Sequence, residues 1–258
     1  MHHFPFGGGK NVFPLYRDKD ANEPNITSGL LEFLTKQYKT NIVAEDLFAY
    51  VYALLGGQSY TKMFWNELET PGARIPVTKD AKLFERASDL GKKLIWLHTH
   101  AQRFRDKNQN RNHKIPQGTA RIIVDITEYP TKFEYKKVSK ELHIGNGRID
   151  SVDSKIWNYE ISGLKVLQSW LGYRMKEPKG RKSSKLDETR PQQWSPDMTT
   201  KLVELIWILE ETLNMESSLT KILQSIIKSE CFEASKMPKP LQSQIIPPKL
   251  STELPLIK

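Results

Sequence analysis

Two histidines separated by one residue, His98 and His100, are the first side chains whose types and spacing could do chemistry. They end the run "IWLHTH", and paired histidines after an apolar run also occur in metal-dependent hydrolases. Those enzymes need a serine and an aspartate further along, where this sequence has Asn108 and Arg111. The apolar spacing before His98 is helical, so residues two apart point to different faces and cannot share one metal ion. We therefore expect His98 to be a hydrogen-bonded histidine at the edge of the core.

A second candidate for chemistry is the pair Glu134 and Lys136, preceded by Asp125, which matches the carboxylate and lysine pattern of magnesium nucleases. Strand-like alternation of "KFEYKK" places this pair on a solvated face, and lysine-rich sheets contain such triplets by chance. The glycines of "GGGKN" lack the strand and the Ser or Thr of a phosphate loop. A serine elbow is not evident, and one cysteine gives no convincing nucleophile. We predict no catalytic residue and no metal site on this chain.

Two basic stretches favour binding to nucleic acid instead. In "YRMKEPKGRKSSKLD" a glycine lets the main chain approach a phosphate, Arg and Lys supply charge, and serines add short donors. In "RFRDKNQNRNHK" the arginines are mixed with amides that can read adenine edges in a major groove. Solvated surface segments would have the same composition, so this alternative stays open. The candidate DNA-binding residues are Arg174, Lys176, Lys179, Arg181, Lys182, Ser183 and Ser184 in the first stretch, and Arg103, Arg105, Asn108 and Arg111 in the second.

The composition fits this interpretation without identifying the partner. The 258 residues carry 39 Lys and Arg against 30 Asp and Glu, a formal net charge of +9 that favours a polyanionic partner. A length of 258 residues, with 38% hydrophobic residues, is enough for a substantial core and excludes a disordered chain or a fibre. The single Cys231 excludes an internal disulfide and fits a reducing compartment. Without an apolar run of membrane-spanning length, we expect a cytoplasmic protein with no membrane partner.

The elements that must position these residues change their periodicity along the chain. Residues 25–105 have helical spacing, and Thr78 is the expected N-cap of the second helix. The expected buried stripe of the first helix is Leu47, Phe48, Val51, Leu54 and Leu55. Residues 116–161 have a period of two in "ARIIVDI", "KFEYKK", "ELHI" and "IWNYEIS", which indicates strands with a turn at "GNG". Helices are predicted again at residues 163–174, from Ser195 through "MTTKLVELIWILEETL", and at residues 218–228.

These patterns predict an α+β fold in which a small antiparallel sheet is flanked by helices, with a helical N-terminal part and a helical C-terminal part. The whole chain, residues 1–258, is expected to form one unit. Residues 12–105 should be mainly helical, and residues 115–235 should hold the sheet with the helices that carry the first basic stretch. The proline-rich residues 236–258 should form a loose tail.

Several long motifs occur in order along the chain: "LYRDKDANEPNIT", "EDLFAYVYALL", "PGARIPVTKDAKLFERASDLGKKLIWLHT", "IPQGTARI", "YEISGLKVLQSWLGYRMK", "GRKSSKLD" and "MTTKLVELIWILEETL". Together they resemble the C-terminal specificity region, or target recognition domain, of type ISP restriction-modification enzymes. The resemblance extends from about residue 12 to the helix before Cys231. Its motifs are specific because several agree in order, although none of them is a catalytic signature.

The resemblance implies a non-catalytic domain that recognises a specific sequence in duplex DNA. In that family a nuclease, an ATP-driven motor and an adenine-N6 methyltransferase precede the recognition domain. These would be the partners of this chain, on the same or a companion polypeptide. S-adenosylmethionine, ATP and Mg would bind to those parts, so we expect no cofactor here. Two other classes stay open: a domain that docks on other subunits through its apolar helices and touches no nucleic acid, and a metal-dependent hydrolase or nuclease built on His98, His100 or Glu134.

Overall fold

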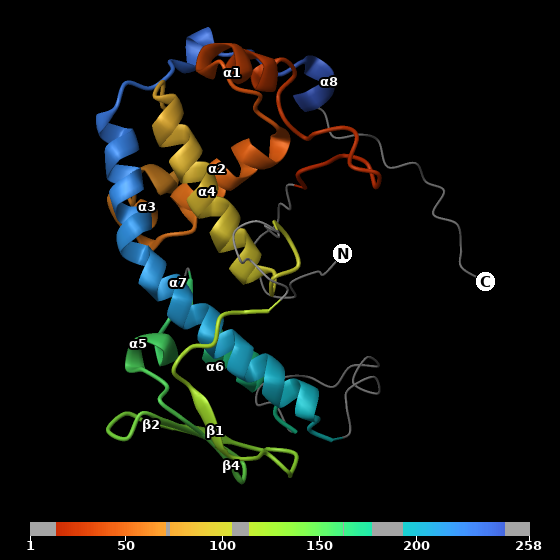
Figure 1. Cartoon of the computed structure of the whole chain (residues 1–258), viewed down its shortest axis with the longest axis vertical. Coiled ribbons are helices and arrows are strands. Elements are labelled where there is room, and N and C mark those ends of the chain that lie inside the picture. Colours follow the sequence, from red (N-terminus) through yellow and green to blue (C-terminus); the bar gives the residue numbers. More distant parts are fainter. Residues whose placement is uncertain (1–13, 71–72, 105–113, 162, 177–192, 246–258) are drawn as a thin grey trace, which may run out of the picture.

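The structure is a computed structural model, and it describes residues 14–70, 73–104, 114–161, 163–176 and 193–245. Its elements are α1 (Leu30–Tyr38), α2 (Ala44–Leu55), α3 (Gln58–Met63), η1 (Glu67–Glu69), α4 (Ala81–His98), β1 (Arg121–Val124), β2 (Phe133–Lys136), β3 (Glu141–Ile144), β4 (Gly147–Asp150), α5 (Ser154–Trp157), β5 (Glu160–Ile161), β6 (Leu164–Lys165), α6 (Val166–Gly172), α7 (Pro196–Lys228), η3 (Ala234–Lys236) and α8 (Gln242–Ile245). Helices at both ends enclose small antiparallel sheets, which confirms the predicted α+β class. In Figure 1 the helical part lies above the larger sheet, and α7 joins the two.

The larger sheet has four antiparallel strands in the order β1-β4-β3-β2. One of its two inner strands, β4, is not predicted by the pattern, because "GRID" is short and has only one large apolar residue. That residue, Ile149, pairs with Leu142 of β3, and both side chains are fully buried. Burial of alternate residues on one face fixes the register, since a shift by one residue would expose the whole apolar set.

Two hydrophobic cores lie along α7. The first is built from the N-terminal helices and the C-terminal half of α7, and includes Tyr50, Phe84, Leu94 and Leu219. The second lies between the four-stranded sheet, α5, α6 and the N-terminal half of α7, and includes Leu142, Leu167, Leu171 and Leu202. A helix with apolar residues on more than one side can bury each side against a different layer.

The single helix α7 replaces two predicted helices. A break is expected between residues 213 and 218 because Asn214, Ser217 and Ser218 are weak helix formers. The helix continues because this stretch has no Pro or Gly, and because Met215 and Leu219 keep the buried stripe going into the first core. Tertiary burial therefore overrides local propensity here.

Two further predictions around the sheet are wrong in detail. The segment "IWNYEIS" is expected to be one strand, but residues 154–157 form the short helix α5, capped by the Asp153 carboxylate, which accepts from Lys155 N at 2.9 Å. A strand follows only at β5. The helix expected at residues 163–174 is shorter, since Leu164 and Lys165 form β6 and α6 covers Val166–Gly172.

The caps and stripes of the N-terminal helices also differ from expectation. Thr78 does not cap α4; Asp80 does, accepting from Lys82 N at 2.8 Å and Leu83 N at 3.1 Å. Thr78 is instead fully buried. In α2 the buried side is set by Ala44, Leu47, Ala49, Tyr50, Ala53 and Leu54, whereas Leu55 is exposed and Phe48 and Val51 are half-buried. Alanine side chains are small enough to let two helices approach closely. A prediction based on large apolar residues alone does not find this buried side.

The C-terminal segment makes contacts as far as it is described. After α7, the short α8 lies near the N-terminal segment, where Gln244 Nε2 donates to Ile26 O at 3.2 Å and Ser28 N donates to Gln244 Oε1 at 3.3 Å. Residues 246–258 of the expected tail lie outside the described residues. In the described parts of the chain, none of the helices has the length and apolar character needed to cross a bilayer.

Candidate nucleic-acid interface

The first basic stretch starts at the end of α6, where Arg174 lies against an aromatic ring. Its guanidinium carbon is 3.9 Å from the centre of the Trp170 ring, and its Nη1 donates to Trp170 O at 3.1 Å. Burial lowers the pKa of this guanidinium from its ordinary value. Arg174 is thus half-buried and already occupied by contacts within the protein. Trp170 is partly buried against the second core, whereas Tyr173 is exposed.

Two other predicted residues are described, and both are exposed. Lys176 follows α6, and its main-chain N–H donates to Pro130 O at 2.9 Å, while the residue itself is exposed to solvent. Arg103 follows α4, and its main-chain N–H donates to Thr99 Oγ1 at 3.1 Å. The remaining candidates lie outside the described residues: Lys179, Arg181, Lys182, Ser183, Ser184, Arg105, Asn108 and Arg111.

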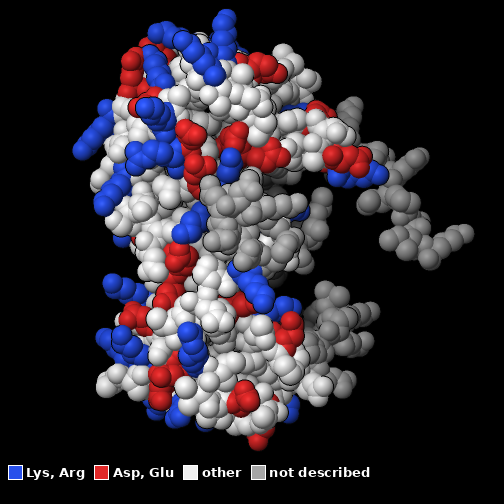
Figure 2. Space-filling model, in the orientation of Figure 1, with Lys and Arg blue, Asp and Glu red and all other residues white. Residues whose placement is uncertain are grey.

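Charge is distributed unevenly between the described chain and the two basic stretches. Residues 105–113 and 177–192 together hold eight Lys and Arg against four Asp and Glu. On the face shown in Figure 2, the described Lys and Arg side chains are interspersed with Asp and Glu from the helical part to the sheet. A large share of the positive excess therefore lies in the two stretches that the sequence identified.

His98 is hydrogen-bonded through both ring nitrogens, which confirms the expected core-edge histidine. Tyr52 Oη lies 2.8 Å from His98 Nδ1, and Thr212 Oγ1 lies 3.1 Å from His98 Nε2. The Thr212 hydroxyl already donates to Ile208 O at 2.7 Å, so it must accept from Nε2–H. Nδ1 is then the unprotonated nitrogen and accepts from the Tyr52 hydroxyl. Burial lowers the pKa of His98 to about 4, so the ring is neutral at pH 7.

The side chains considered as candidates for a hydrolase or nuclease site are either separated from one another or exposed to solvent. His100 lies beyond the end of α4 in a left-handed conformation with φ of 50°, and its Nδ1 is 3.7 Å from Glu204 Oε2. Glu134 and Lys136 are exposed on β2 and pair with each other at 3.3 Å. Within the described ranges, no group of three or more His, Cys, Asp and Glu is arranged to hold a metal ion.

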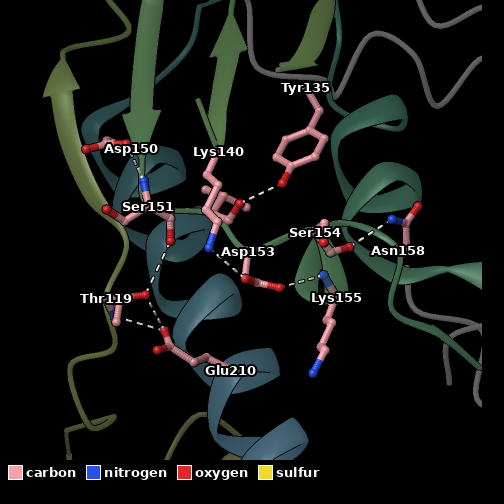
Figure 3. Close-up of polar contacts among 11 residues, drawn as sticks. Thr119, Tyr135, Lys140, Asp150, Ser151, Asp153, Ser154, Lys155, Asn158 and Glu210 are labelled. Atoms are coloured by element: carbon pink, nitrogen blue, oxygen red, sulfur yellow. Dashed lines mark hydrogen bonds and ion pairs between the residues drawn. The ribbon is translucent and has the colours of Figure 1, made fainter. Parts of the chain in front are cut away.

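A polar joint, formed by Thr119, Ser151 and Glu210, ties the sheet to α7 (Figure 3). Glu210 Oε2 accepts from Thr119 N at 2.8 Å and from Thr119 Oγ1 at 3.1 Å, and this hydroxyl also lies 3.3 Å from Ser151 O. Nearby, donation from Lys155 N and Lys140 Nζ holds the pKa of Asp153 below its ordinary value. These carboxylates line an open hollow of about 690 Å³. Their hydrogen bonds go to the protein itself, so the joint holds the sheet in place.

Two elements of the site are missed by sequence reasoning. The first is the joint, whose residues are distant in sequence and carry no motif. The second is Trp194, which is buried and contacts Trp170 edge to face with ring centres 6.3 Å apart. Its place just before Ser195-Pro196, where a helix start is predicted, is the available signal that an aromatic anchor precedes α7.

The comparison with known families decides the assignment. A family model described as the type ISP C-terminal specificity domain matches residues 1–205. The chain belongs to this family of specificity domains. The resemblance found in the sequence is thereby confirmed.

Two solved structures share the fold of this specificity domain. A cryo-EM structure of a DrdV–DNA complex aligns with a TM-score of 0.54 and 16% identity, covering 85% of this chain and 21% of that chain. The ATP-dependent type ISP restriction-modification enzyme LlaBIII bound to DNA aligns with a TM-score of 0.50 and 19% identity, covering 78% of this chain and 12% of that chain. The specificity domain therefore spans about a fifth or less of the chains it matches. Among curated proteins, no match is found.

Proposed function

We propose that this specificity domain recognises a specific sequence in duplex DNA and does not itself catalyse a reaction. The observation that carries the proposal is the family match over 205 residues, which is supported by the fold shared with two proteins that were solved as DNA complexes. The finer proposal is that it serves an adenine-N6 methyltransferase and a motor with nuclease activity. These partners, on the same or a companion polypeptide, would hold the S-adenosylmethionine, ATP and Mg sites. We place its action in the cytoplasm.

The two basic stretches are the proposed contact surfaces. Lysines and arginines that neutralise phosphates release counterions, so removing a phosphate-binding side chain should make the salt dependence of binding less steep. Arg103 and Lys176 are exposed where the described chain approaches these stretches. Lys176 is proposed to contact the DNA backbone, whereas Arg103, Arg105, Asn108 and Arg111 are proposed readers of base edges, with the Asn108 amide suited to adenine.

The test is duplex binding as a function of salt concentration. Removing two phosphate contacts with Arg181→Ala and Lys182→Ala together should weaken binding to every duplex. It should also reduce the slope of log affinity against log salt by about 2. The matched control is Lys221→Ala with Lys228→Ala, which removes the same charge from exposed positions of α7 beside the first core. If both pairs of substitutions lower affinity equally, only net charge matters and the "GRKSS" stretch is not an interface.

A docking function is the second candidate, and β1 is the observation that favours it. Ile122, Ile123 and Val124 are 41%, 50% and 42% exposed on a strand at the edge of the sheet. Exposed aliphatic edge strands can pair with another chain. Substituting Ile123 by Lys should abolish association with a partner domain while leaving the salt-dependent DNA binding intact. Loss of both activities would indicate that β1 takes part in the DNA interface.

A further inference from the structure

Arg174, at the end of α6, is held by contacts within the protein that binding to a phosphate would not require. The guanidinium lies over Trp170 with its carbon 3.9 Å from the ring centre, and one of its nitrogens donates to the main chain. A guanidinium over an aromatic ring gains cation–π attraction, and more so where water is excluded. Part of its donor capacity is already used inside the protein, so fewer donors remain for a phosphate.

The chain just before α7 is also held at the Trp170 ring, through Trp194. Trp194 is only 6% exposed, contacts Trp170 edge to face, and donates from Nε1 to Thr199 Oγ1 at 2.8 Å. The next residue, Ser195, caps α7, with its hydroxyl accepting from Met198 N at 3.3 Å. Trp194 is therefore held by both a ring contact and the first turns of a long helix.

The outgoing end is fixed to the sheet as well. Met175 is 5% exposed in the second core, and Lys176 N donates to Pro130 O at 2.9 Å. Pro130 is buried beside the turn between β3 and β4, where a Cβ atom added at Gly145 would lie 3.1 Å from its ring. Both ends of the stretch between residues 176 and 193 are thus attached to one core.

We propose that Trp170, Arg174 and Trp194 form a positioning clamp for DNA recognition, and that Arg174 acts through its stack on Trp170 and not through a phosphate. Arg174 and Trp194 stand on either side of the first basic stretch in the sequence, and fixing both flanks preorganises the protein for binding in one geometry, which lowers the entropic cost of binding. Specific binding needs one geometry, whereas non-specific binding tolerates many. The clamp therefore contributes to discrimination between sequences more than to overall affinity. This inference rests on the proposed function.

Arg174→Lys separates stacking from charge, because lysine keeps the cation but lacks the planar group that stacks on tryptophan. The cognate duplex is first selected from a random pool by the wild-type chain. We expect Arg174→Lys and Arg174→Met to reduce the ratio of cognate to random-duplex affinity about tenfold, which corresponds to a contact of this type. The salt slope on random duplex should stay that of wild type. Trp194→Phe, which keeps the ring contact but loses the Nε1 donor, should reduce the ratio less.

Four results would overturn the clamp. Arg174→Lys with wild-type discrimination would show that charge suffices, and a salt slope lowered by about 1 in Arg174→Met would identify a phosphate contact. If the Arg174 variants lose the same factor of affinity for cognate and random duplexes and also melt at a lower temperature, the role of Arg174 is structural only. A wild-type chain without salt-dependent duplex binding would overturn the proposed function and this inference together. If the wild type binds duplex DNA and Arg174→Lys keeps the wild-type ratio of cognate to random-duplex affinity, only the clamp is overturned and the proposed function stands.

Discussion

Ile208 and Leu209 are neighbours on α7, yet they are buried in different cores. Ile208, 3% exposed, packs with the N-terminal helices, and Leu209, 4% exposed, packs with the sheet and α6. Adjacent helix residues point about 100° apart, so α7 presents one side to each core at the point where the two halves meet. The helix therefore couples the two cores, as its course in Figure 1 illustrates.

We predict that Ile208→Ala and Leu209→Ala each lower the free energy of unfolding by about 2–5 kcal/mol, the usual range for truncating a buried aliphatic residue. Both variants should still unfold in one transition, because loss of either core removes a packing surface from the same helix. Chemical denaturation followed by far-UV circular dichroism and by tryptophan fluorescence would check this. Two separated transitions in either variant would show that the halves are independent.

A second stability prediction concerns the crossing of α2 and α4. Gly91 of α4 lies so close to α2 that an added Cβ atom would be 1.8 Å from Ala49 O. A main-chain atom cannot move aside as a side chain can, so Gly91→Ala must separate the two helices. We expect it to lower the free energy of unfolding by about 3 kcal/mol or more, at the upper end of overpacking effects.

The control for this substitution is Gly172→Ala at the end of α6. A Cβ atom there would meet no atom within 4 Å. Alanine should be neutral or stabilise the fold by up to about 1 kcal/mol, because it restricts the unfolded chain. Similar melting temperatures for the two variants would mean that α2 and α4 are not in close contact through Gly91.

A third prediction tests the joint between sheet and α7. Glu210→Ala removes the acceptor of Thr119 N and of the Thr119 hydroxyl, and should cost about 0.5–1.5 kcal/mol, because Thr119 is exposed and water can replace the lost acceptor. Glu210→Gln keeps an acceptor oxygen and should cost less. Asn214→Ala, at an exposed position one turn along α7, is the control. Thermal unfolding of the three variants would check this order of stabilities. If Glu210→Gln and Glu210→Ala lower the stability equally, the hydrogen bonds to Thr119 do not account for the effect.

The elements with a clear periodicity are predictable, and those decided by long-range packing are not. The stripe of α4, with Phe84, Ala87, Leu94 and Leu97 buried, follows from helical spacing alone. The continuous α7 does not, because the weak helix formers around Asn214 are overruled by burial of Met215 against the N-terminal helices, which lie more than a hundred positions away in the sequence. Strand β4 is similar, since its place between β1 and β3 depends on partners and not on its own composition.

For the candidate site, the amino-acid composition locates the basic stretches, but it cannot tell a residue that contacts DNA from one that only holds the chain in position. The sequence treats Arg174 and Lys176 alike, as cations two positions apart. The structure shows that Arg174 is half-buried on a tryptophan while Lys176 is exposed, a difference that arises from the packing of α6 on the sheet. The role of Trp194 has the same origin, because its contact with Trp170 joins positions 24 residues apart.

The pH dependence of stability should depend on His98. Its pKa is lowered by burial from the ordinary 6.5 to about 4. The unfolded chain therefore binds a proton between pH 6.5 and 4 that the folded chain does not. The contribution of the neutral ring is fully present above pH 6.5, decreases as the pH falls, and has lost about 3 kcal/mol by pH 4. Below pH 4 both states carry the proton, so this residue causes no further change.

His98→Gln removes this titration while retaining one donor and one acceptor for Thr212 and Tyr52. We expect the variant to be about 1–2 kcal/mol less stable at pH 8, where the wild-type hydrogen bonds are intact. Its stability should decrease less steeply than that of wild type between pH 6.5 and 4, so the two curves should converge or cross. The matched control is His100→Gln, at a more exposed histidine beyond the end of α4. Denaturant titrations at half-unit pH steps would show this, and parallel curves for wild type and His98→Gln would mean that another group controls the acid transition.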